Sequence, residues 1–493
     1  MGQIAPVFGS IVPSQTQLPL ANNYLAFNTA AAGANDFAQQ YLPEVYEAEV
    51  ERYGNRTLGG FLKMVGAEMP MTSDQVIWSE QNRLHISYTG CTLTGPGAGT
   101  FVFSVPTNAA VGATSIKNAI APNDTIVVMN PTTGVTLKGI VGAVAANGAL
   151  TNVTAYPFTT ANWDTLGIAA AAGAAGLKIF VYGSLFAKGT GSGNFSVQPQ
   201  FTQYSNQPII IKDRFEINGS DMAQIGWVEV ATEDGTSGYL WYLKSESETR
   251  LRFDDYLEMA MVEGELAAAG GGFTANVAGV PGFNVAGINS HGTEGLFQAI
   301  TNRGNIMSGF QGATGISDFD QILKNLDTQG AIEENMLFLN RDTDLEFDDM
   351  LSQISAGQSG GTAYGLFENS EDMALNLGFS GFRRGSYDFY KTSWKYLNDA
   401  STRGAVAVNN IDGVLIPAGT STVYDQILGT NIRRPFLHVR YRASQGDDRR
   451  YKNWITGTAG GAYTSEIDSM IVNWLSERCL VTQAANNFVL FQS

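Results

Sequence analysis

One stretch of the sequence, residues 91–200, is almost free of charge. It holds six charged side chains in 110 positions, none of them Glu or Arg, whereas 15% of the whole chain is charged. Short runs rich in Val, Ile, Phe and Thr, such as 100–105 and 177–182, alternate there with turns rich in Gly, Asn and Pro. Closely spaced strands of this kind predict a small antiparallel sandwich or barrel. We therefore expect a β-rich domain inserted into a host chain of ordinary composition.

The segments on either side of this insert also look extended. Residues 75–78 and 84–88 precede it and residues 208–217 follow it. We expect these segments to pair as a long ribbon that carries the insert at its tip. A two-stranded ribbon is only marginally stable in water. It therefore either folds onto its own domain or lies on a neighbouring subunit.

If the ribbon lies on a neighbour, its apolar side chains should anchor it. Trp78 and the side formed by the three consecutive isoleucines are the expected anchors; Arg83 lies between the two segments before the insert, and Arg214 lies on the segment after it. The ribbon's candidates for a subunit interface are Trp78, Arg83, Ile209, Ile210, Ile211 and Arg214.

The clearest helix is predicted over residues 237–268, which contain no Pro and end before three consecutive glycines. Glu246 with Arg250 and Glu248 with Arg252 are pairs four residues apart in the favourable order. At 1.5 Å per residue this helix would be about 48 Å long. It is too long for one compact core, and a strut across a broad domain is its natural use.

The rest of the chain has a mixed α and β pattern. The first 35 residues lack clear periodicity and are expected to form an extended arm that becomes ordered only against something else. After residue 292 the pattern predicts helices following Ser317 and over 345–354. The predicted strands are 336–339, 386–390, 414–416, 435–441, 470–475 and 488–491.

Charge and cysteine content exclude several classes of protein. With 29 Lys and Arg against 46 Asp and Glu, the net charge is −17, which argues against a dedicated nucleic-acid binder. Cys91 and Cys479 are the two cysteines, so no disulfide framework or thiolate metal site is expected. Residues 1–6 do not resemble a secretory signal. The apolar stretch 166–187 has Lys178 at its centre, which argues against a membrane span.

Candidate catalytic patterns are weak. His85, His291 and His438 lie far apart in the sequence, and no nucleotide-binding or zinc-protease motif is present. The acidic run 342–346 lacks the glycine of a calcium loop and is better explained as the start of a helix. Paired carboxylates could serve glycoside hydrolysis, and the candidates are Asp254, Asp255, Asp348 and Asp349. We expect no enzyme activity, cofactor or metal.

Two oppositely charged segments are candidates for contact between subunits. The basic cluster consists of Arg433, Arg434, Arg440, Arg442, Arg449, Arg450 and Lys452. The acidic segment 233–265 includes Glu246, Glu248, Asp254 and Asp255. Opposite patches on one chain suit head-to-tail association, because complementary fields steer subunits into register. Ion pairing within the chain and a nucleic-acid patch remain the alternatives.

Four segments carry a family resemblance: DFAQQYLPEVYE at 36–47, QVIWSEQ at 75–81, GSYDFYKTSW at 385–394 and SERCLVTQ at 476–483. The order of arm, ribbon with insert, long helix and mixed domain resembles the major capsid protein of tailed bacteriophages, with the Hong Kong-type capsid fold. The amino-acid sequences of the four segments are similar to those of capsid proteins of crAss-like phages of gut Bacteroidales. The resemblance covers about residues 36–90 and 205–493.

The resemblance implies an α+β capsid fold. Residues 1–60 would be the N-terminal arm and 65–217 the extended loop, with the β-rich insertion domain at 91–200. Residues 218–325 would be the peripheral domain with the spine helix 237–268, and 326–493 the axial domain with strands returning to the peripheral domain. Some relatives join subunits through a Lys–Asn bond, but no Asn partner or catalytic Glu is identified here, so that activity is not carried over.

The expected function is structural: self-assembly into an icosahedral shell around phage double-stranded DNA. Its partners would be copies of itself in hexameric and pentameric capsomers, together with portal and auxiliary or decoration proteins. The DNA would be enclosed without specific binding, and no membrane would be involved. Assembly would take place in the bacterial host cytoplasm. A β-rich surface-layer, fibre or adhesin subunit is the first alternative, and a carbohydrate hydrolase using acidic pairs is the second.

Overall fold

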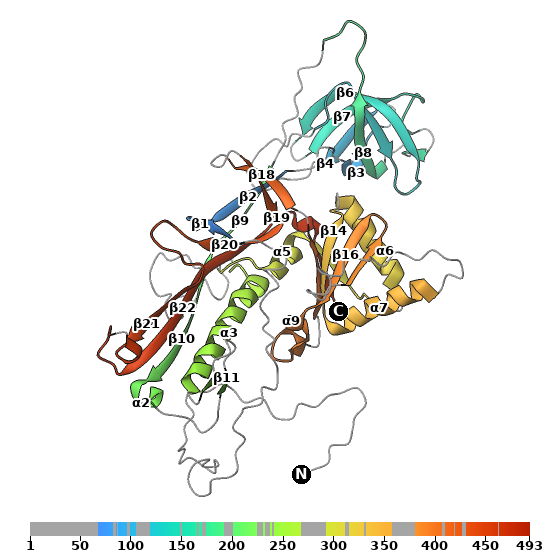
Figure 1. The fold of residues 1–493 in the computed structure, drawn as a ribbon. Helices are drawn as coiled ribbons and strands as arrows, with labels where there is room; N and C mark the ends of the chain where they lie inside the picture. The colour runs from blue at the N-terminus through green and yellow to red at the C-terminus, as the bar shows by residue number, and fades with distance from the viewer. Residues whose placement is uncertain are drawn as a thin grey trace. The chain divides into compact units, whose positions relative to one another are not determined.

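The structure is a computed structural model, and its chain divides into two compact units (Figure 1). The main unit comprises residues 1–78 and 205–493, and the barrel unit comprises residues 79–204. The residues that the structure describes are 68–81, 85, 87–95, 99–104, 119–147, 150–164, 167–169, 174–191, 201–223, 230–231, 237–238, 241–267, 292–310, 315–329, 332–356, 380–406, 410–418, 420–425, 430–461 and 463–493. The expected N-terminal arm, Arg83 and His291 lie outside the described residues.

The barrel unit is a closed antiparallel barrel, one of the two folds that the charge-poor stretch predicts. The strands run in the order β3-β4-β7-β6-β5-β8 around the barrel. Their bounds are β3 Ser87–Leu93, β4 Thr100–Ser104, β5 Asp124–Met129, β6 Thr136–Asn147, β7 Leu150–Pro157 and β8 Ala174–Ser184. Closure removes the unpaired strand edges that a sheet otherwise exposes.

The barrel has a hydrophobic core of its own, and Trp163 is among its largest buried side chains. The indole Nε1 donates a hydrogen bond to the carbonyl of Ala155 at 2.8 Å. Its ring meets the ring of Phe101 edge to face, with 4.9 Å between the centroids. Gly99 has a φ of +62°, and a Cβ there would lie 2.0 Å from the Ala155 carbonyl oxygen, so only glycine fits this turn.

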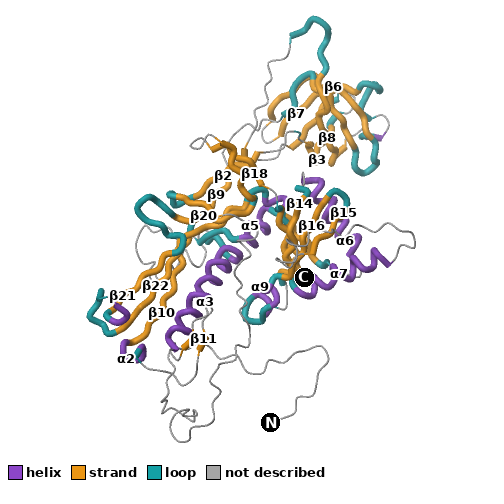
Figure 2. Tube along the Cα trace, viewed as in Figure 1, coloured by secondary structure: helices purple, strands orange, loops and turns teal. Residues whose placement is uncertain are grey.

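A five-stranded sheet forms one part of the main unit. Its strands run β1-β20-β22-β10, and β21 also pairs with β22. The bounds are β1 Glu68–Met71, β20 Leu437–Arg442, β22 Ser469–Thr482, β10 Ile209–Asn218 and β21 Lys452–Gly457. Helix α3, Trp241–Glu263, lies along β10 and β22 (Figure 2). Phe253 and Leu257 of α3 pack there on Phe215, Val472 and Trp474.

The predicted ribbon is wrong in its pairing. Residues 209–218 form β10, which pairs along its full length with residues 469–478 of β22 rather than with the segments before the insert. Of those segments, β2 (Val76–Gln81) pairs with β9 (Phe201–Asn206), while Ser87 and Tyr88 belong to barrel strand β3. The alternating apolar residues of β10 favour this arrangement, because they bury one face against α3.

The predicted long helix is shorter at both ends than expected. Helix α3 contains 23 residues, whereas Ser237 and Gly238 form strand β12 and residues 264–267 are not helical. The carbonyl of Gly264 accepts a hydrogen bond from the backbone N–H of Gly295 at 2.8 Å. A Cβ on Gly264 would come within 2.6 Å of the Ala260 carbonyl, so this close packing requires glycine where the helix ends.

A six-stranded mixed sheet forms the second part of the main unit, in the order β13-β23-β17-β14-β16-β15. Its bounds are β13 Asn305–Ser308, β23 Val489–Gln492, β17 Ile411–Pro417, β14 Glu334–Leu339, β16 Tyr387–Ser393 and β15 Ser380–Arg384. Helices α6 (Gly315–Gln329) and α7 (Arg341–Ala356) pack on one face. The core on the other face includes α5 (Leu296–Arg303) and α9 (Lys395–Asn398). The helices and strands predicted after residue 292 are thereby confirmed.

Smaller elements complete the described chain: α2 Gly219–Met222, β11 Val230–Ala231, β12 Ser237–Gly238, β18 Thr420–Asp425, β19 Thr430–Pro435, and the short 3-10 helices Arg403–Ala405, Ala459–Gly461 and Ala485–Asn487. Strands β11 and β12 pair with each other, as do β18 and β19. None of the described helices is long and apolar enough to cross a membrane.

Candidate subunit interface

The basic cluster predicted to meet a neighbour is largely paired within its own chain. Glu477, on β22, is buried between two arginines: Arg449 Nε lies 2.5 Å from one carboxylate oxygen, and Arg442 Nη1 donates a hydrogen bond to the other at 3.3 Å. Arg442 also pairs with Asp74. Lys452 Nζ lies 2.7 Å from Asp447. These cations therefore stabilise the edge of the five-stranded sheet.

Glu68, the first residue of β1, serves as a second shared anion. Arg450 Nε lies 2.5 Å and Arg478 Nη1 lies 3.6 Å from its carboxylate. Burial lowers the pKa of Arg478, and the neighbouring carboxylate of Glu68 opposes that shift. Arg440 donates a weak hydrogen bond to the carbonyl of Pro70 at 3.4 Å. Of the predicted cluster, only Arg433 and Arg434, on β19, have side chains outside the described set.

Two residues of the acidic segment, the base Arg252 and the acid Asp254, also have partners within the chain. Arg252 of α3 forms two hydrogen bonds with Asp213 on β10, at 2.9 and 3.0 Å. Burial, together with the neighbouring Asp254 carboxylate, raises the pKa of Tyr451 to about 12. The ring of Tyr451 also packs against Phe253, with 5.5 Å between the centroids. For these residues, the alternative of pairing within the chain is the one that the structure shows.

The remaining acidic candidates also lie on or near this helix. Glu246 has a raised pKa because burial disfavours its charged form, and Arg250 opposes that effect. Glu248 is exposed and Asp255 is half-buried. The other acidic pair considered for hydrolysis, Asp348 and Asp349, lies on α7. Asp348 lies 2.6 Å from Lys391 Nζ, and Lys391 is almost fully buried. The side chain of Asp349 lies outside the described set.

Trp78 belongs to the core of its own chain. It is 7% exposed, and the guanidinium of Arg303 lies 5.5 Å from its ring centroid. Arg303 is itself held by Glu294 at 2.5 Å. The expectation that Trp78 anchors a neighbouring subunit is therefore corrected, because little of its surface is available. The exposed apolar residue of β2 is Ile77, on the opposite side of the strand.

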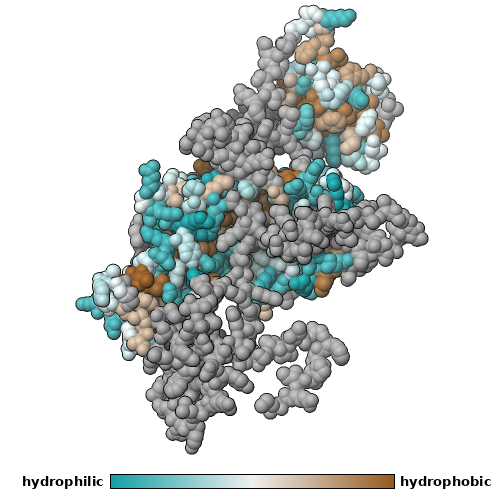
Figure 3. Space-filling view, in the orientation of Figure 1, coloured by the Kyte–Doolittle hydropathy of each residue, from teal (hydrophilic) through white to brown (hydrophobic). Residues whose placement is uncertain are grey.

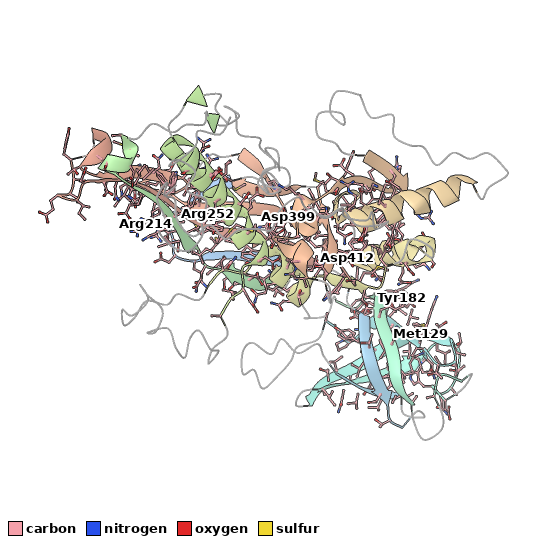
Figure 4. The ribbon with its side chains drawn as sticks, turned by 90° about the horizontal axis from the view of Figure 1, so that it is seen from below. Met129, Tyr182, Arg214, Arg252, Asp399 and Asp412 are labelled. Atoms are coloured by element: carbon pink, nitrogen blue, oxygen red, sulfur yellow. The ribbon has the colours of Figure 1, made fainter. Side chains whose placement is uncertain are left out.

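The three isoleucines of β10 are divided between the two faces of the sheet. Ile209 and Ile211 are half-buried and pack on hydrophobic clusters of the main unit. Ile210 is 52% exposed on the face that α3 does not cover. Arg214 lies on the same face as Ile210, and its side chain is well exposed (Figure 4). Among the predicted anchors, Ile210 and Arg214 are thus the ones available to a partner.

Strands β22 and β21 continue this face beside β10. Directly paired residues share a face of a sheet, and the registers align Lys212 with Leu475 and Lys452, and Arg214 with Asn473 and Trp454. We call this surface the open face and define it as Ile210, Lys212, Arg214, Glu216, Ile471, Asn473, Lys452, Trp454 and Thr456; Leu475 lies on the same side of the sheet but is buried. Trp454 is an exposed indole near its centre, which sequence reasoning missed because the pairing of β21 is not visible locally.

The hairpin that joins β21 to β22 ends in a loop with two exposed apolar side chains. In this tip loop, residues 458–468, Tyr463 is 86% exposed and Ile467 is also exposed. The loop is tied down by hydrogen bonds of Thr464 to Gly457 and of Thr458 to Ile467. A constrained loop that presents a tyrosine and an isoleucine has the composition of a protein-protein contact. The open face and the tip loop together form the candidate subunit interface.

No protein-family model matches this chain, and no curated protein matches it. Solved structures similar to it include a chain of Microbacterium phage Oxtober96, at 8% identity and a TM-score of 0.38 over 91% of this chain and 95% of that chain. A chain of the bacteriophage PhiM1 mature capsid has 8% identity and a TM-score of 0.37 over 97% and 98%. A chain of the native GTA particle capsid has 9% identity and a TM-score of 0.34 over 95% and 99%. TM-scores below 0.5 do not establish a common fold.

Proposed function

We propose that this chain is the structural major capsid protein of a tailed-phage-type particle, and that its copies assemble into an icosahedral shell around double-stranded DNA. The observation that carries the proposal is the open face: a sheet packed by α3 on one side leaves Ile210 and Trp454 exposed on the other. A sheet usually buries at least one face, and its second face is either polar or covered. Here the second face mixes large apolar side chains with cations, which suits contact with another subunit.

Self-association provides the physical mechanism. Full burial of an exposed large apolar side chain contributes roughly 1.5–3 kcal/mol, and about half of that is available from Ile210 and Trp454, which are 52% and 38% exposed. Each subunit would repeat that contact with its neighbours, and contacts that join different patches close into rings when the rotation permits. A lasting shell contact would bury upward of about 2,000 Å². The copies are expected to assemble into hexameric and pentameric capsomers, and portal and auxiliary proteins would be further partners.

The acidic composition fits a container for DNA. A net charge of −17 per subunit repels phosphate rather than binding it. The in-chain pairing of Arg442, Arg449 and Arg450 further reduces the cations available to nucleic acid. The chain's role would be structural and not enzymatic, within the virion capsid of a phage assembled in its bacterial host. The proposed affiliation with crAss-like phages rests on the amino-acid sequences of residues 36–47, 75–81, 385–394 and 476–483.

The surface-layer or fibre alternative is distinguished by the form of the assembly. Purified chain examined by negative-stain microscopy should give closed shells, polyhedra or capsomer rings. Flat lattices or fibres would favour the alternative, and dispersed monomers would contradict self-assembly altogether.

A paired substitution tests the open face directly. The double variant Ile210→Ser, Trp454→Ser should fold normally, because both side chains are exposed and such changes rarely alter stability by more than about 0.5 kcal/mol. Its assembly should require at least about tenfold more protein, since Ile210 and Trp454 are 52% and 38% exposed, their two lost contacts together amount to about 1.5–3 kcal/mol, and each 1.4 kcal/mol is a factor of ten.

The matched control is Ile306→Ser. Ile306 lies on the edge strand β13 and is 48% exposed, against 52% for Ile210. Sedimentation velocity measures the assembled fraction of each variant. Normal assembly of the double variant, or an equal defect in the control, would show that the open face is not the subunit contact.

A further inference from the structure

The outside of the barrel carries a group of aromatic side chains that its core does not use. Tyr156 and Phe158 belong to or directly follow β7, and Phe180 and Tyr182 lie on β8; all four are between 45% and 55% exposed. The core of the barrel is complete without them. Large exposed apolar patches on a folded domain mark interaction sites.

The strand registers show that these side chains form one continuous surface. Phe180 pairs with Val127 on β5, Val127 pairs with Lys138 on β6, and the backbone N–H of Phe158 donates to the carbonyl of Lys138 at 3.0 Å. These four residues therefore form a row across four adjacent strands. We call Tyr156, Phe158, Phe180, Tyr182 and Lys138 the aromatic face.

Two local contacts hold rings of the aromatic face in place. The ammonium of Lys138 lies 5.6 Å from the ring centroid of Tyr182, and Figure 4 labels Tyr182 on the barrel together with Met129 of β5. The ring of Tyr156 rests over Gly142, where a Cβ would come within 2.7 Å of it. Rings that are already positioned lose little conformational entropy on binding.

The charge of the barrel unit is opposite to that of the rest of the chain. Residues 79–204 hold five Lys and Arg against three Asp and Glu, a net charge of +2. The main unit keeps the other 24 Lys and Arg against 43 Asp and Glu, a net charge of −19. Figure 3 shows mostly apolar and neutral colours on the visible face of the barrel unit, and many hydrophilic residues on the main unit.

We propose that the aromatic face of the barrel docks on the acidic main unit of a second copy of this chain. The barrel is closed, so strand addition at an edge is not available and the contact must be made by side chains. Lys138 and the exposed Lys178, which pairs with Met129 beside the face, supply the cations. Carboxylates of the second copy's main unit supply the opposite charge, so that complementary fields set the orientation.

One part of the main unit matches the aromatic face particularly well. At the start of α7, Leu345 is about half exposed between Asp342 and Glu346. Burial raises the pKa of nearby Asp412, and the carboxylates of Glu346 and Asp342 raise it further. An exposed apolar side chain with carboxylates on either side complements aromatic rings flanked by lysines. Contacts of the aromatic face are expected to fall here first.

This inference deepens the proposed function, because it assigns a partner to the insert within the self-assembly. The test uses full-length chains, one half labelled with nitrogen-15, mixed before assembly and treated with a zero-length carbodiimide that joins lysines to carboxylates. Mass spectrometry then identifies which lysine is joined to which carboxylate, and whether the two come from different copies. The expected result is mixed-isotope links from Lys138 or Lys178 to main-unit carboxylates, with Asp342 and Glu346 the most frequent.

Matched variants connect those links to the aromatic face. Lys138→Glu with Lys178→Glu, and separately Tyr156→Ser with Phe180→Ser, should reduce the mixed links of the barrel to the main unit at least tenfold. Lys188→Glu is the control, because Lys188 is also exposed on the same unit but follows β8 outside the face.

Three results would overturn the inference: links within single copies only, links from these lysines to Asp124 or Asp164 of another barrel, or no links from them at all. Microscopy of the same samples scores the shell separately. Shells without mixed barrel links would refute this inference and leave the proposed function standing. Links between barrel lysines and main-unit carboxylates of different copies, in samples that never form shells, would support this inference and contradict the proposed function.

Discussion

Replacement of Trp163 by alanine should open the barrel unit and leave the main unit folded. The side chain is fully buried, its indole donates to the Ala155 carbonyl at 2.8 Å, and its ring packs on Phe101. Truncation of a buried Trp costs roughly 3–5 kcal/mol, and leaving a buried carbonyl without its donor costs roughly 1–3 kcal/mol more. A loss of about 5 kcal/mol raises the opened population of the barrel by roughly 10³ to 10⁴, at 1.4 kcal/mol per factor of ten.

The two cysteines report on the two units separately. Cys91 lies in the barrel and Cys479 in the main unit; both are fully buried, and burial raises the pKa of each thiol to about 12. At pH 8, alkylation of either thiol therefore requires opening of its unit. In the Trp163→Ala variant, alkylation of Cys91, followed by peptide mass spectrometry, should accelerate at least about 1,000-fold, while that of Cys479 stays unchanged.

A conservative variant grades the effect. Trp163→Phe keeps an aromatic ring in the core but removes the donor to Ala155, so Cys91 should react only about 10 to 100 times faster than in the parent chain. Equal acceleration at Cys91 and Cys479 in the alanine variant would show that the two units unfold together. No acceleration at Cys91 would show that Trp163 does not support the barrel. Either result would refute the reasoning.

Two predictions concern charges in the main unit. Glu477→Gln leaves Arg442 and Arg449 without their shared anion and should lower the free energy of unfolding by about 2 kcal/mol, a figure reduced because both arginines are partly exposed; a urea midpoint equal to that of the parent chain would contradict this. A hydrogen bond from Arg384 lowers the pKa of Asp320 below its ordinary value of 3.8, so its stabilisation is complete above pH 3.8 and is lost as the pH falls further. The melting temperatures of the parent chain and of Asp320→Asn should therefore differ at pH 6 and converge near pH 2. A difference that does not change with pH would show that the ionised Asp320 does not stabilise the fold through Arg384.

The insertion domain could be predicted from the sequence, because its composition differs from that of the host and its strands are short and local. The pairing of β10 could not, because its partner, residues 469–478, lies some 250 positions further along the chain. Both the segments before the insert and β22 are plausible partners for an apolar strand of that length. Alternation along β10 shows that one face is buried, but not which distant strand lies beside it.

The candidate interface was predictable only in part, for a related reason. Strand β2 presents Ile77 and Trp78 to opposite sides, and the indole is the buried one, where it lies against the distant Arg303. The arginines near residue 450 form a dense basic cluster in the sequence, yet Glu68 and Glu477 lie far from several of them along the chain and pair with them in space. A local concentration of charge does not show whether its counterions lie within the same chain.

The pairing of β2 with β9 has a consequence for how such a chain can vary. The polypeptide leaves the main unit along one strand of this pair and returns along the other, so pairing of β2 with β9 holds the two ends of the barrel unit together. Any domain whose own ends lie close together could replace the barrel there without shifting the alignment of β10 on β22. The host chain can thus exchange its inserted domain, in evolution or by design, while the sheet that contains β10 and β22 stays the same.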